Sequence, residues 1–290
     1  MLKEKPVIVK KTPILRDARI LVATPNYTNL FSAEAHVNHS EAFCYWQRIG
    51  LTFHNVIIGR TFVHFARTQL CETALLGDFT HVFWLDDDAT IEPELLPTLI
   101  MHDKEVIVTP YPMRRPPHEI GALLSTTGDF RKHETYRNLE IKDMDQGLIE
   151  IDGGATHAML MKTEVLTTLG IAEENGVDMY SMKDEHALGR PYFMMPKTGT
   201  EDMYLCYRLK LKGVKIWCDT DTFAGHVGFA PVVTRAYRET MEQMAMQSSD
   251  TTNGLPVLEL RETNSNGGPH RPVSTMRRHQ VDRSKAASLV

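Results

Sequence analysis

The stretch Thr80-His-Val-Phe-Trp-Leu85, followed directly by Asp86-Asp87-Asp88, decides the fold class of this chain. Its residues from Val82 to Leu85 are all apolar, and a short apolar run that ends in charged residues predicts a buried strand. A run without alternation is typical of strands that are covered on both faces, as in parallel sheets. The three aspartates are therefore expected at the carboxyl end of a strand inside a sheet.

The segments on either side of this strand alternate between strand-like and helix-like patterns. The predicted strands cover residues 19–24, 52–58, 80–85 and 105–109, and the predicted helices cover 32–50, 64–76 and 92–103. Gly77 ends the second helix, and Pro93 falls in the first turn of the third, where proline is tolerated. This alternation predicts an α/β fold with a Rossmann-like, mostly parallel sheet flanked by helices.

The second half of the chain is less regular. Residues 148–152 and 156–161 are predicted to form a strand that is broken by Gly153-Gly154, and a further strand is predicted over 214–218. The predicted helices cover 163–169 and 201–212. We expect an N-terminal arm over residues 1–18, one folded domain over 19–245 and a polar, basic tail over 246–290. The tail is predicted because the composition turns rich in Gly, Ser, Thr and Asn there.

The bulk composition limits the class of protein. The chain has 290 residues, of which 42% are hydrophobic, and a formal net charge of -5. It can therefore bury a sizeable core, and it does not have the charge of a protein that coats nucleic acid over its whole surface. No apolar run reaches the roughly 18 residues of a membrane span, and residues 1–13 lack the apolar core of a signal peptide. The four cysteines lack C-x-x-C spacing and lie in apolar stretches, which predicts reduced core thiols in a cytoplasmic protein.

Three adjacent aspartates at the end of a buried strand need a partner of positive charge. Their mutual repulsion would raise their pKa values unless a cation neutralised them, and ligands of open α/β sheets bind at this edge. Asp86 and Asp88, two positions apart, can both reach one divalent ion, which prefers oxygen ligands. The alternative is that one aspartate caps the next helix while the others face solvent. Phosphatases, nucleases and polymerases also carry acids at strand ends, so the cluster alone does not define a reaction.

The segment from Thr80 to Pro93 resembles the D-x-D segment of GT-A glycosyltransferases, in which a hydrophobic strand, D-x-D and a proline-containing helix start follow one another. The likeness extends, in the order of elements, over residues 19–228. It implies that the aspartates hold Mn²⁺ or Mg²⁺ against the diphosphate of a nucleotide sugar and contact its ribose. Within the donor site, Asp88 is expected to ligate the metal, Asp86 to contact metal or ribose, and Asp87 to be a neighbour without a direct role.

A later acidic pair matches another part of the family pattern. Thr200-Glu201-Asp202 resembles the acidic start of a helix whose aspartate removes the proton of the acceptor hydroxyl in inverting, family-2-like enzymes. The resemblance implies a catalytic role for Asp202, with Glu201 beside it. Acids in a first helical turn also stabilise the helix dipole, and Thr198 with Glu201 fits a capping box, so a structural role remains open.

The segment after the last predicted strand carries His226 between Gly225 and Gly228. Many members of the family supply a histidine at this place as an additional metal ligand, and neutral imidazole is a suitable ligand for Mn²⁺. The resemblance therefore implies that His226 binds the metal. A histidine taken alone is more often structural.

Three weaker candidates complete the predicted donor site. Thr24-Pro25-Asn26 ends the first strand, where the family holds the base and ribose of the nucleotide. Arg60 and Arg67 lie on either side of the second helix start and suit phosphate recognition, although Arg67 fits a surface salt bridge equally well. Gly153-Gly154 would let the backbone approach a sugar closely, and a β-bulge explains the pair equally well.

The implied reaction is transfer of a sugar from a nucleotide sugar, with UDP as the expected carrier, to an acceptor hydroxyl. Inversion or retention at the anomeric carbon stays open. A nucleotidyltransferase is the leading alternative, weakened because no glycine-rich phosphate loop follows the first strand. A metal-dependent phosphohydrolase and an inactive module that binds glycans or nucleic acid are the others.

The acceptor is the least determined part of the prediction, with a glycan, a protein and a hydroxymethylated DNA base all open. One feature favours a polyanion, because residues 271–290 are rich in basic side chains. These are Arg271, Arg277, Arg278, Arg283 and Lys285, against Asp282 alone. With Arg114 and Arg115 they would contact phosphates and give salt-dependent binding to DNA. A solubilising tail is an equally good interpretation.

Overall fold

A computed structural model of the chain describes residues 13–114, 116–169, 192–196 and 199–228. The chain divides into two compact units, Met1–Ser249 and Asp250–Val290, and every described residue belongs to the first. The predicted arm up to residue 12, most of the segment 171–198 and the predicted tail lie outside the described residues, so their boundaries stay predictions.

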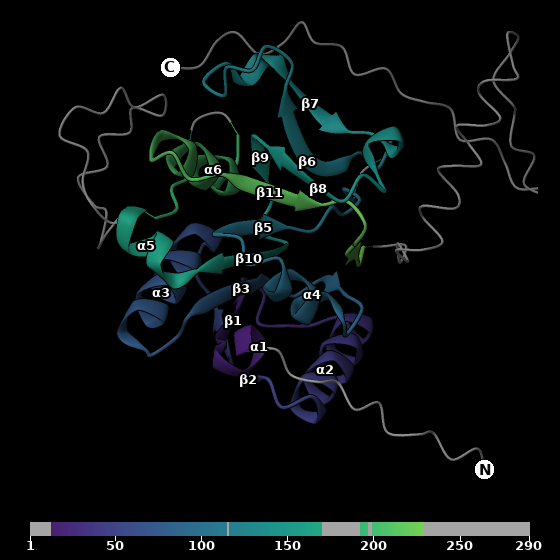
Figure 1. The fold of residues 1–290 in the computed structure, drawn as a ribbon. Coiled ribbons are helices and arrows are strands. Elements are labelled where there is room, and N and C mark those ends of the chain that lie inside the picture. The colour runs from purple at the N-terminus through teal and green to yellow at the C-terminus, as the bar shows by residue number, and fades with distance from the viewer. Residues whose placement is uncertain (1–12, 115, 170–191, 197–198, 229–290) are drawn as a thin grey trace, which may run out of the picture. The chain divides into compact units, whose positions relative to one another are not determined.

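A seven-stranded sheet forms the centre of the first unit, in the order β2-β1-β3-β10-β5-β11-β8 (Figure 1). The strands are β1 (Arg19–Asn26), β2 (Thr52–Gly59), β3 (His81–Leu85), β5 (Val106–Val108), β8 (Leu148–Ile151), β10 (Ala158–Lys162) and β11 (Ile216–Asp219). β1 pairs in parallel with β2 and β3, and β5 pairs in parallel with β11. β10 runs antiparallel to both of its neighbours, and β8 runs antiparallel to β11. The predicted α/β architecture with a mostly parallel sheet is confirmed.

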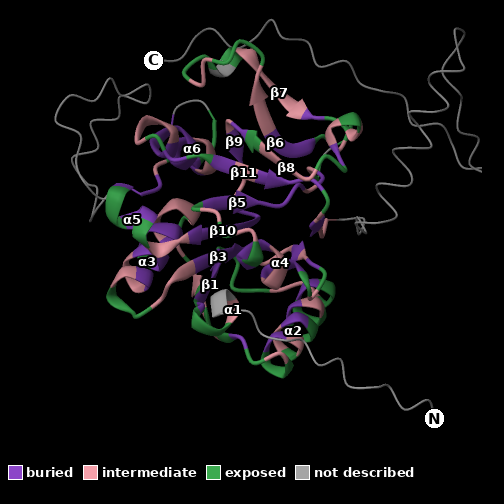
Figure 2. Ribbon diagram, viewed as in Figure 1, coloured by how far each residue is buried: buried purple, intermediate pink, exposed green. Residues whose placement is uncertain are grey.

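Helices cover both faces of this sheet, and the strands bury apolar residues toward each face (Figure 2). Leu21 and Ala23 of β1 pack in one core with helices α3 (Val63–Leu76), α5 (Thr163–Leu169) and α6 (Glu201–Leu211). Ile20 and Val22 pack in the other core with α2 (Ala33–Arg48) and α4 (Leu95–Met101). This arrangement explains why the strands are continuous apolar runs. A short helix, α1 (Pro13–Asp17), precedes β1.

Two smaller sheets lie beside the central one. β6 (Ile120–Ser125) pairs with β7 (Tyr136–Leu139) and with β9 (Gly153–Gly154). β4 (Ala89–Thr90) pairs with β12 (Gly225–His226), which places His226 opposite Ala89. Because β4 directly follows the three aspartates, this two-stranded ribbon carries His226 to the end of β3. Two 3-10 turns, His133–Thr135 and Ile141–Asp143, flank β7.

The structure corrects several expectations at the level of elements. β6, β7 and the ribbon β4–β12 were not predicted, and α4 begins at Leu95, so Pro93 precedes the helix instead of lying in its first turn. The capping residue of α6 is Thr200, whose hydroxyl accepts from the amide of Met203. Cys44 is exposed on α2, whereas the other three cysteines are buried as predicted, and all four are free. None of the described helices combines the length and apolar character needed to cross a bilayer.

Candidate functional site

The three aspartates lie where β3 ends, as predicted, but the strand beside them runs in the opposite direction. The amide of Asp86 donates to the carbonyl of His157, with 3.1 Å between nitrogen and oxygen. His157 comes immediately before β10, and because β10 is antiparallel to β3, the start of β10 meets the end of β3. His157 therefore enters the site from a segment that was not predicted to reach it.

Asp88, His157 and His226 form a cluster whose ligand atoms all lie within 4.8 Å of one another. The Nδ1 atom of His157 is 3.8 Å from an Asp88 carboxylate oxygen and 3.5 Å from one of Asp86. The Nε2 atom of His226 is 3.6 Å from the other oxygen of Asp88. One carboxylate and two imidazoles at these separations form a candidate metal centre.

Hydrogen bonds to backbone carbonyls decide which ring nitrogen each histidine turns toward Asp88. His157 Nε2 lies 2.8 Å from the carbonyl oxygen of Gly225, and His226 Nδ1 lies 3.0 Å from that of Pro112. A carbonyl oxygen only accepts, so these nitrogens carry protons. In a ring with one proton, the lone pair then lies on the other nitrogen, which faces Asp88. Burial lowers the pKa of His226 to about 3, so its ring has one proton at neutral pH. Lone pairs and carboxylate thus converge, which is the donor set of a divalent metal.

Tyr111 holds both imidazoles in place. Its ring stacks on that of His157, with centroids 4.3 Å apart and an angle of 25°, and its centroid is 5.5 Å from that of His226. Gly121 of β6 lies close against the Tyr111 ring, because a methyl group added there would collide with it. The orientation of the histidines therefore depends on a glycine outside the cluster.

Arg67 of α3 joins the aspartate cluster to the start of α6. Its side chain is 3% exposed, and Nη2 donates to Asp86 over 2.9 Å while Nε donates to Glu201 over 3.3 Å. Asp202 lies 3.9 Å from the same guanidinium. Burial alone would raise the pKa of Asp86, but Arg67 and His157 together outweigh it and lower that pKa to about 2. The guanidinium that was predicted to reach a diphosphate or base is thus engaged with the buried Glu201 and the half-buried Asp86 and Asp202.

At the start of α6, the pKa values of the acidic pair Glu201 and Asp202 are raised, in contrast to that of Asp86. Burial and the neighbouring Asp202 raise the pKa of Glu201 to about 7. Burial also raises the pKa of Asp202, although Arg67 opposes it. Asp202 accepts a hydrogen bond from the hydroxyl of Thr156, the residue before His157. This contact connects the acidic pair to the metal cluster through two adjacent residues.

Asp87 lies between the two aspartates that make specific contacts. Burial and the neighbouring Asp86 raise its pKa to about 6. Arg114 and Arg67 oppose this rise, and the role of Asp87 stays a prediction.

The residues that were predicted to bind the nucleotide lie along the same edge of the sheet. Thr24 and Asn26 at the end of β1 are buried, and the Oδ1 atom of Asn26 has no hydrogen-bond partner among the described residues. The carbonyl of Asn26 accepts from the amide of Arg60, over 3.3 Å, so the ends of β1 and β2 are tied together. Two exposed rings stand beside them: Tyr27 and Phe62, 64% and 62% exposed, stack with centroids 6.3 Å apart.

Packing accounts for Gly153 and Gly154 without a ligand. Both are buried, and a methyl group on Gly153 would press on Met203 of α6, whereas one on Gly154 would press on Val108 of β5. The amide of Gly154 also donates to the Cys206 thiol, over 3.3 Å. The close backbone approach that the pair allows is therefore made to the protein itself.

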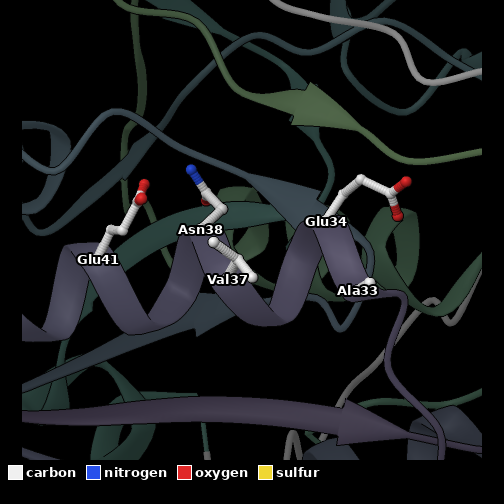
Figure 3. Close-up of a pocket in the computed structure, with 5 residues that line it drawn as sticks. All are labelled: Ala33, Glu34, Val37, Asn38 and Glu41. Carbon is white, nitrogen blue, oxygen red and sulfur yellow. The ribbon is translucent and has the colours of Figure 1, made fainter.

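A pocket of about 410 Å³ lies away from this cluster, on the outer face of α2 (Figure 3). Its lining consists of Ala33, Glu34, Val37, Asn38 and Glu41, all from one helix. Asn38 is committed to the backbone of Ile91 through both of its amide atoms, so the face offers two carboxylates and no convergent polar set. It does not have the chemistry of an active site.

Comparisons with known proteins identify no family for this chain. No family model and no curated protein matches its sequence. Among solved structures, A197 from STIV is similar over 72% of this chain and 86% of its own, at 14% identity and a TM-score of 0.46. GalNAc-T7, crystallised with UDP, GalNAc and Mn²⁺, is similar over 73% of this chain but only 44% of its own, at 11% identity and a TM-score of 0.41. Likenesses of this strength carry no functional argument, so the chemistry has to come from the site.

The structure brings most of the predicted site residues to one edge of the sheet. One group of predicted residues surrounds the end of β3: Asp86, Asp87, Asp88, Glu201, Asp202, His226 and Arg67. A second group lies where the neighbouring strands β1 and β2 end: Thr24, Pro25, Asn26 and Arg60. Sequence reasoning missed His157, Thr156 and Tyr111. A signal existed for the first two, because Thr156-His157 are polar residues directly before an apolar run. They would have been found only by treating that run as a strand antiparallel to β3.

Proposed function

We propose that this chain is a metal-dependent glycosyltransferase that moves a sugar from a nucleotide sugar to an acceptor hydroxyl. The observation that carries the proposal is the convergence of Asp88, His157 and His226 next to the Arg67-linked acids Asp86, Glu201 and Asp202. A metal centre and a separate pair of carboxylates with raised pKa values, side by side at the carboxyl edge of a sheet, suit donor activation and proton removal.

Asp88, His157 and His226 would hold the metal, which supplies positive charge against the departing nucleoside diphosphate. Two imidazoles in the donor set favour Mn²⁺ over Mg²⁺, because Mg²⁺ prefers oxygen ligands and retains its waters. Asp86 has a different task. Its carboxylate is held by Arg67 and stays ionised, so it would place a fixed negative charge beside the metal.

The acidic pair would accept the acceptor's proton. In the transfer, the acceptor oxygen bonds to the anomeric carbon, the bond from that carbon to the diphosphate oxygen breaks, and the proton passes to Asp202. A base works best when its pKa is close to the working pH. Burial raises the pKa values of Glu201 and Asp202 toward that range. Thr156 and Arg67 fix the orientation of Asp202.

The rings of Tyr27 and Phe62 suit the nucleotide base, because exposed aromatic faces stack on bases. Arg60, exposed at the end of β2, offers a positive charge at the same edge. UDP as the carrier, the acceptor, a DNA role for the basic tail and the cytoplasmic location remain predictions.

The proposal is tested by measuring Mn²⁺-dependent binding and turnover of a panel of nucleotide sugars, with water or a glycan as the acceptor. Asp88→Asn should abolish the metal-dependent part of nucleotide binding. Asp202→Asn should keep donor binding and lower turnover by about 100-fold or more, the usual contribution of a general base. Asp103→Asn, at a surface ion pair with Lys162, is the matched control and should behave as the wild type.

Two results would replace the proposal. Metal-dependent nucleotide binding without any turnover across the panel would indicate a binding module. Release of pyrophosphate from a nucleoside triphosphate and a sugar phosphate would indicate a nucleotidyltransferase. Loss of donor binding in Asp202→Asn would remove the base assignment while leaving the metal centre intact.

A further inference from the structure

Arg114 lies directly on the candidate metal centre. Its Nε donates to Nε2 of His226 over 2.8 Å, and its Nη2 contacts the Asp88 carboxylate. Both partners belong to the cluster that would hold the metal. The sequence predicted that Arg114 contacts phosphates and did not predict its contact with the metal centre.

The contact uses the same electrons that a metal would use. Nδ1 of His226 is committed to the carbonyl of Pro112, so the ring has one lone pair, on Nε2. That lone pair accepts from Arg114, and it cannot bind a metal at the same time. Arginine keeps its positive charge throughout the physiological range. It therefore supplies to Asp88 and His226 both the charge and the hydrogen bond that would otherwise be missing.

We propose that Arg114 competes with the divalent metal for Asp88 and His226 and thereby sets the metal affinity of the centre. The inference rests on the metal centre of the proposed function. It adds that binding is an exchange: the metal takes over the His226 lone pair and the Asp88 oxygen, and the guanidinium leaves with its proton and charge intact.

Exchange requires only the side chain to move. The flanking backbone is held in place, because the Pro112 carbonyl accepts from His226, the amide of Met113 donates to Glu119 over 2.8 Å, and the amide of Ala224 donates to Pro110 over 2.9 Å. The side chain of Arg114 is 52% exposed, so rotation about its own bonds carries the guanidinium into solvent. His157, by contrast, is buried and keeps its place.

The size of the effect follows from the share of time for which Arg114 covers the centre. A site that is open for about a tenth of the time binds its ligand with about tenfold lower apparent affinity. Removing the guanidinium should therefore strengthen metal binding, which is the opposite of the result expected for a residue that helps to hold the metal.

The experiment is a calorimetric titration of Mn²⁺ into chelator-treated full-length protein, without nucleotide. Arg114→Ala and Arg114→Gln should each bind Mn²⁺ about tenfold more tightly than the wild type. Arg131→Ala, which removes another exposed arginine paired with Asp129, is the control and should leave the affinity unchanged. Repeating the titration at about 1 M salt, where the Debye length is about 3 Å, separates direct displacement from a general charge effect.

The measured Mn²⁺ affinities either support or overturn the exchange between Arg114 and the metal. Tighter binding in both Arg114 variants that persists at high salt supports the exchange, including the case in which only the variants bind measurably. Equal or weaker binding overturns it, and so does a gain that disappears at high salt. In those cases Mn²⁺ binding that is lost in Asp88→Asn leaves the metal centre standing. If neither the wild type nor any variant binds Mn²⁺, both the exchange and the proposed centre fail.

Discussion

At His157 the direction of one hydrogen bond determines what the side chain can offer to a ligand. The proton on Nε2 is donated to the carbonyl of Gly225, and Nδ1 faces the carboxylates of Asp86 and Asp88 at 3.5 and 3.8 Å. A lone pair and carboxylate oxygens repel one another unless a cation lies between them. A divalent metal ion is such a cation, and titration with metal tests for it.

We predict that His157→Gln weakens Mn²⁺ binding by about 10- to 100-fold, because one of three ligands in the candidate centre is lost. His81→Gln is the matched control. His81 lies at the start of β3, at the end of that strand opposite to the aspartates, and its replacement should leave the metal affinity unchanged. Calorimetric titration measures both. An unchanged affinity in His157→Gln would mean that His157 is not a ligand of the bound metal.

Arg67 is a buried cation whose partners outnumber it. Replacing it by methionine leaves the buried Glu201 and the half-buried Asp86 and Asp202 without a counter-charge, which costs about 3–5 kcal/mol. The loss should be smaller at pH 5 than at pH 7, because the carboxylates that lose Arg67 then take up protons. Urea unfolding at the two pH values measures the difference.

The control for Arg67→Met is Arg19→Met. Arg19 pairs with Asp78 at the surface, where both side chains are exposed, so its loss should cost under about 1 kcal/mol at either pH. A loss in Arg67→Met that does not depend on pH would indicate lost packing on Trp84 and Phe193 in place of lost charge pairing.

At the scale of elements, the direction of β10 separates what the sequence could predict from what it could not. The apolar run over 158–161 indicates a buried strand whether it runs with or against β3. The direction follows from where the chain returns to the sheet, which depends on contacts between distant segments. For this reason Asp86 to Asp88 could be placed at the site from local pattern, whereas Thr156 and His157 could not.

The support of Tyr111 by β6 gives a prediction at the same scale. Gly121→Ala should displace the Tyr111 ring, because the added methyl group would collide with it, and should weaken Mn²⁺ binding by releasing His157. Tyr111→Phe keeps the ring and should bind Mn²⁺ as the wild type does. In a double-mutant cycle, Gly121→Ala should have no further effect once Tyr111→Ala has removed the ring. Additive effects on affinity would show that Gly121 acts independently of Tyr111.

For the whole molecule, the free energy of unfolding below pH 7 depends on groups whose pKa shifts act in opposite directions. Burial lowers the pKa values of His39 and His81 to about 4. Between pH 6.5 and 4 the unfolded chain therefore binds protons that the folded protein does not, and stability falls as the pH falls. Glu201 acts in the other direction. Its folded pKa of about 7 lies above the ordinary value of 4.5, so the folded protein binds this proton before the unfolded chain does. Its contribution to stability therefore grows as the pH falls from 7 toward 4.5.

Glu201→Gln removes this opposing contribution, so the variant should lose stability more steeply than the wild type between pH 7 and 4.5. Urea unfolding at intervals of pH measures the difference between the two free energies. Glu150→Gln serves as the contrast, because Lys215 lowers the pKa of Glu150 below its ordinary value of 4.5, so that its contribution is lost only as the pH falls below about 4.5. Between pH 7 and 4.5 the stability of Glu150→Gln should therefore run parallel to that of the wild type, whereas that of Glu201→Gln should not. Parallel curves for wild type and Glu201→Gln would mean that Arg67 holds Glu201 ionised across this range, and proton removal would then rest on Asp202 alone.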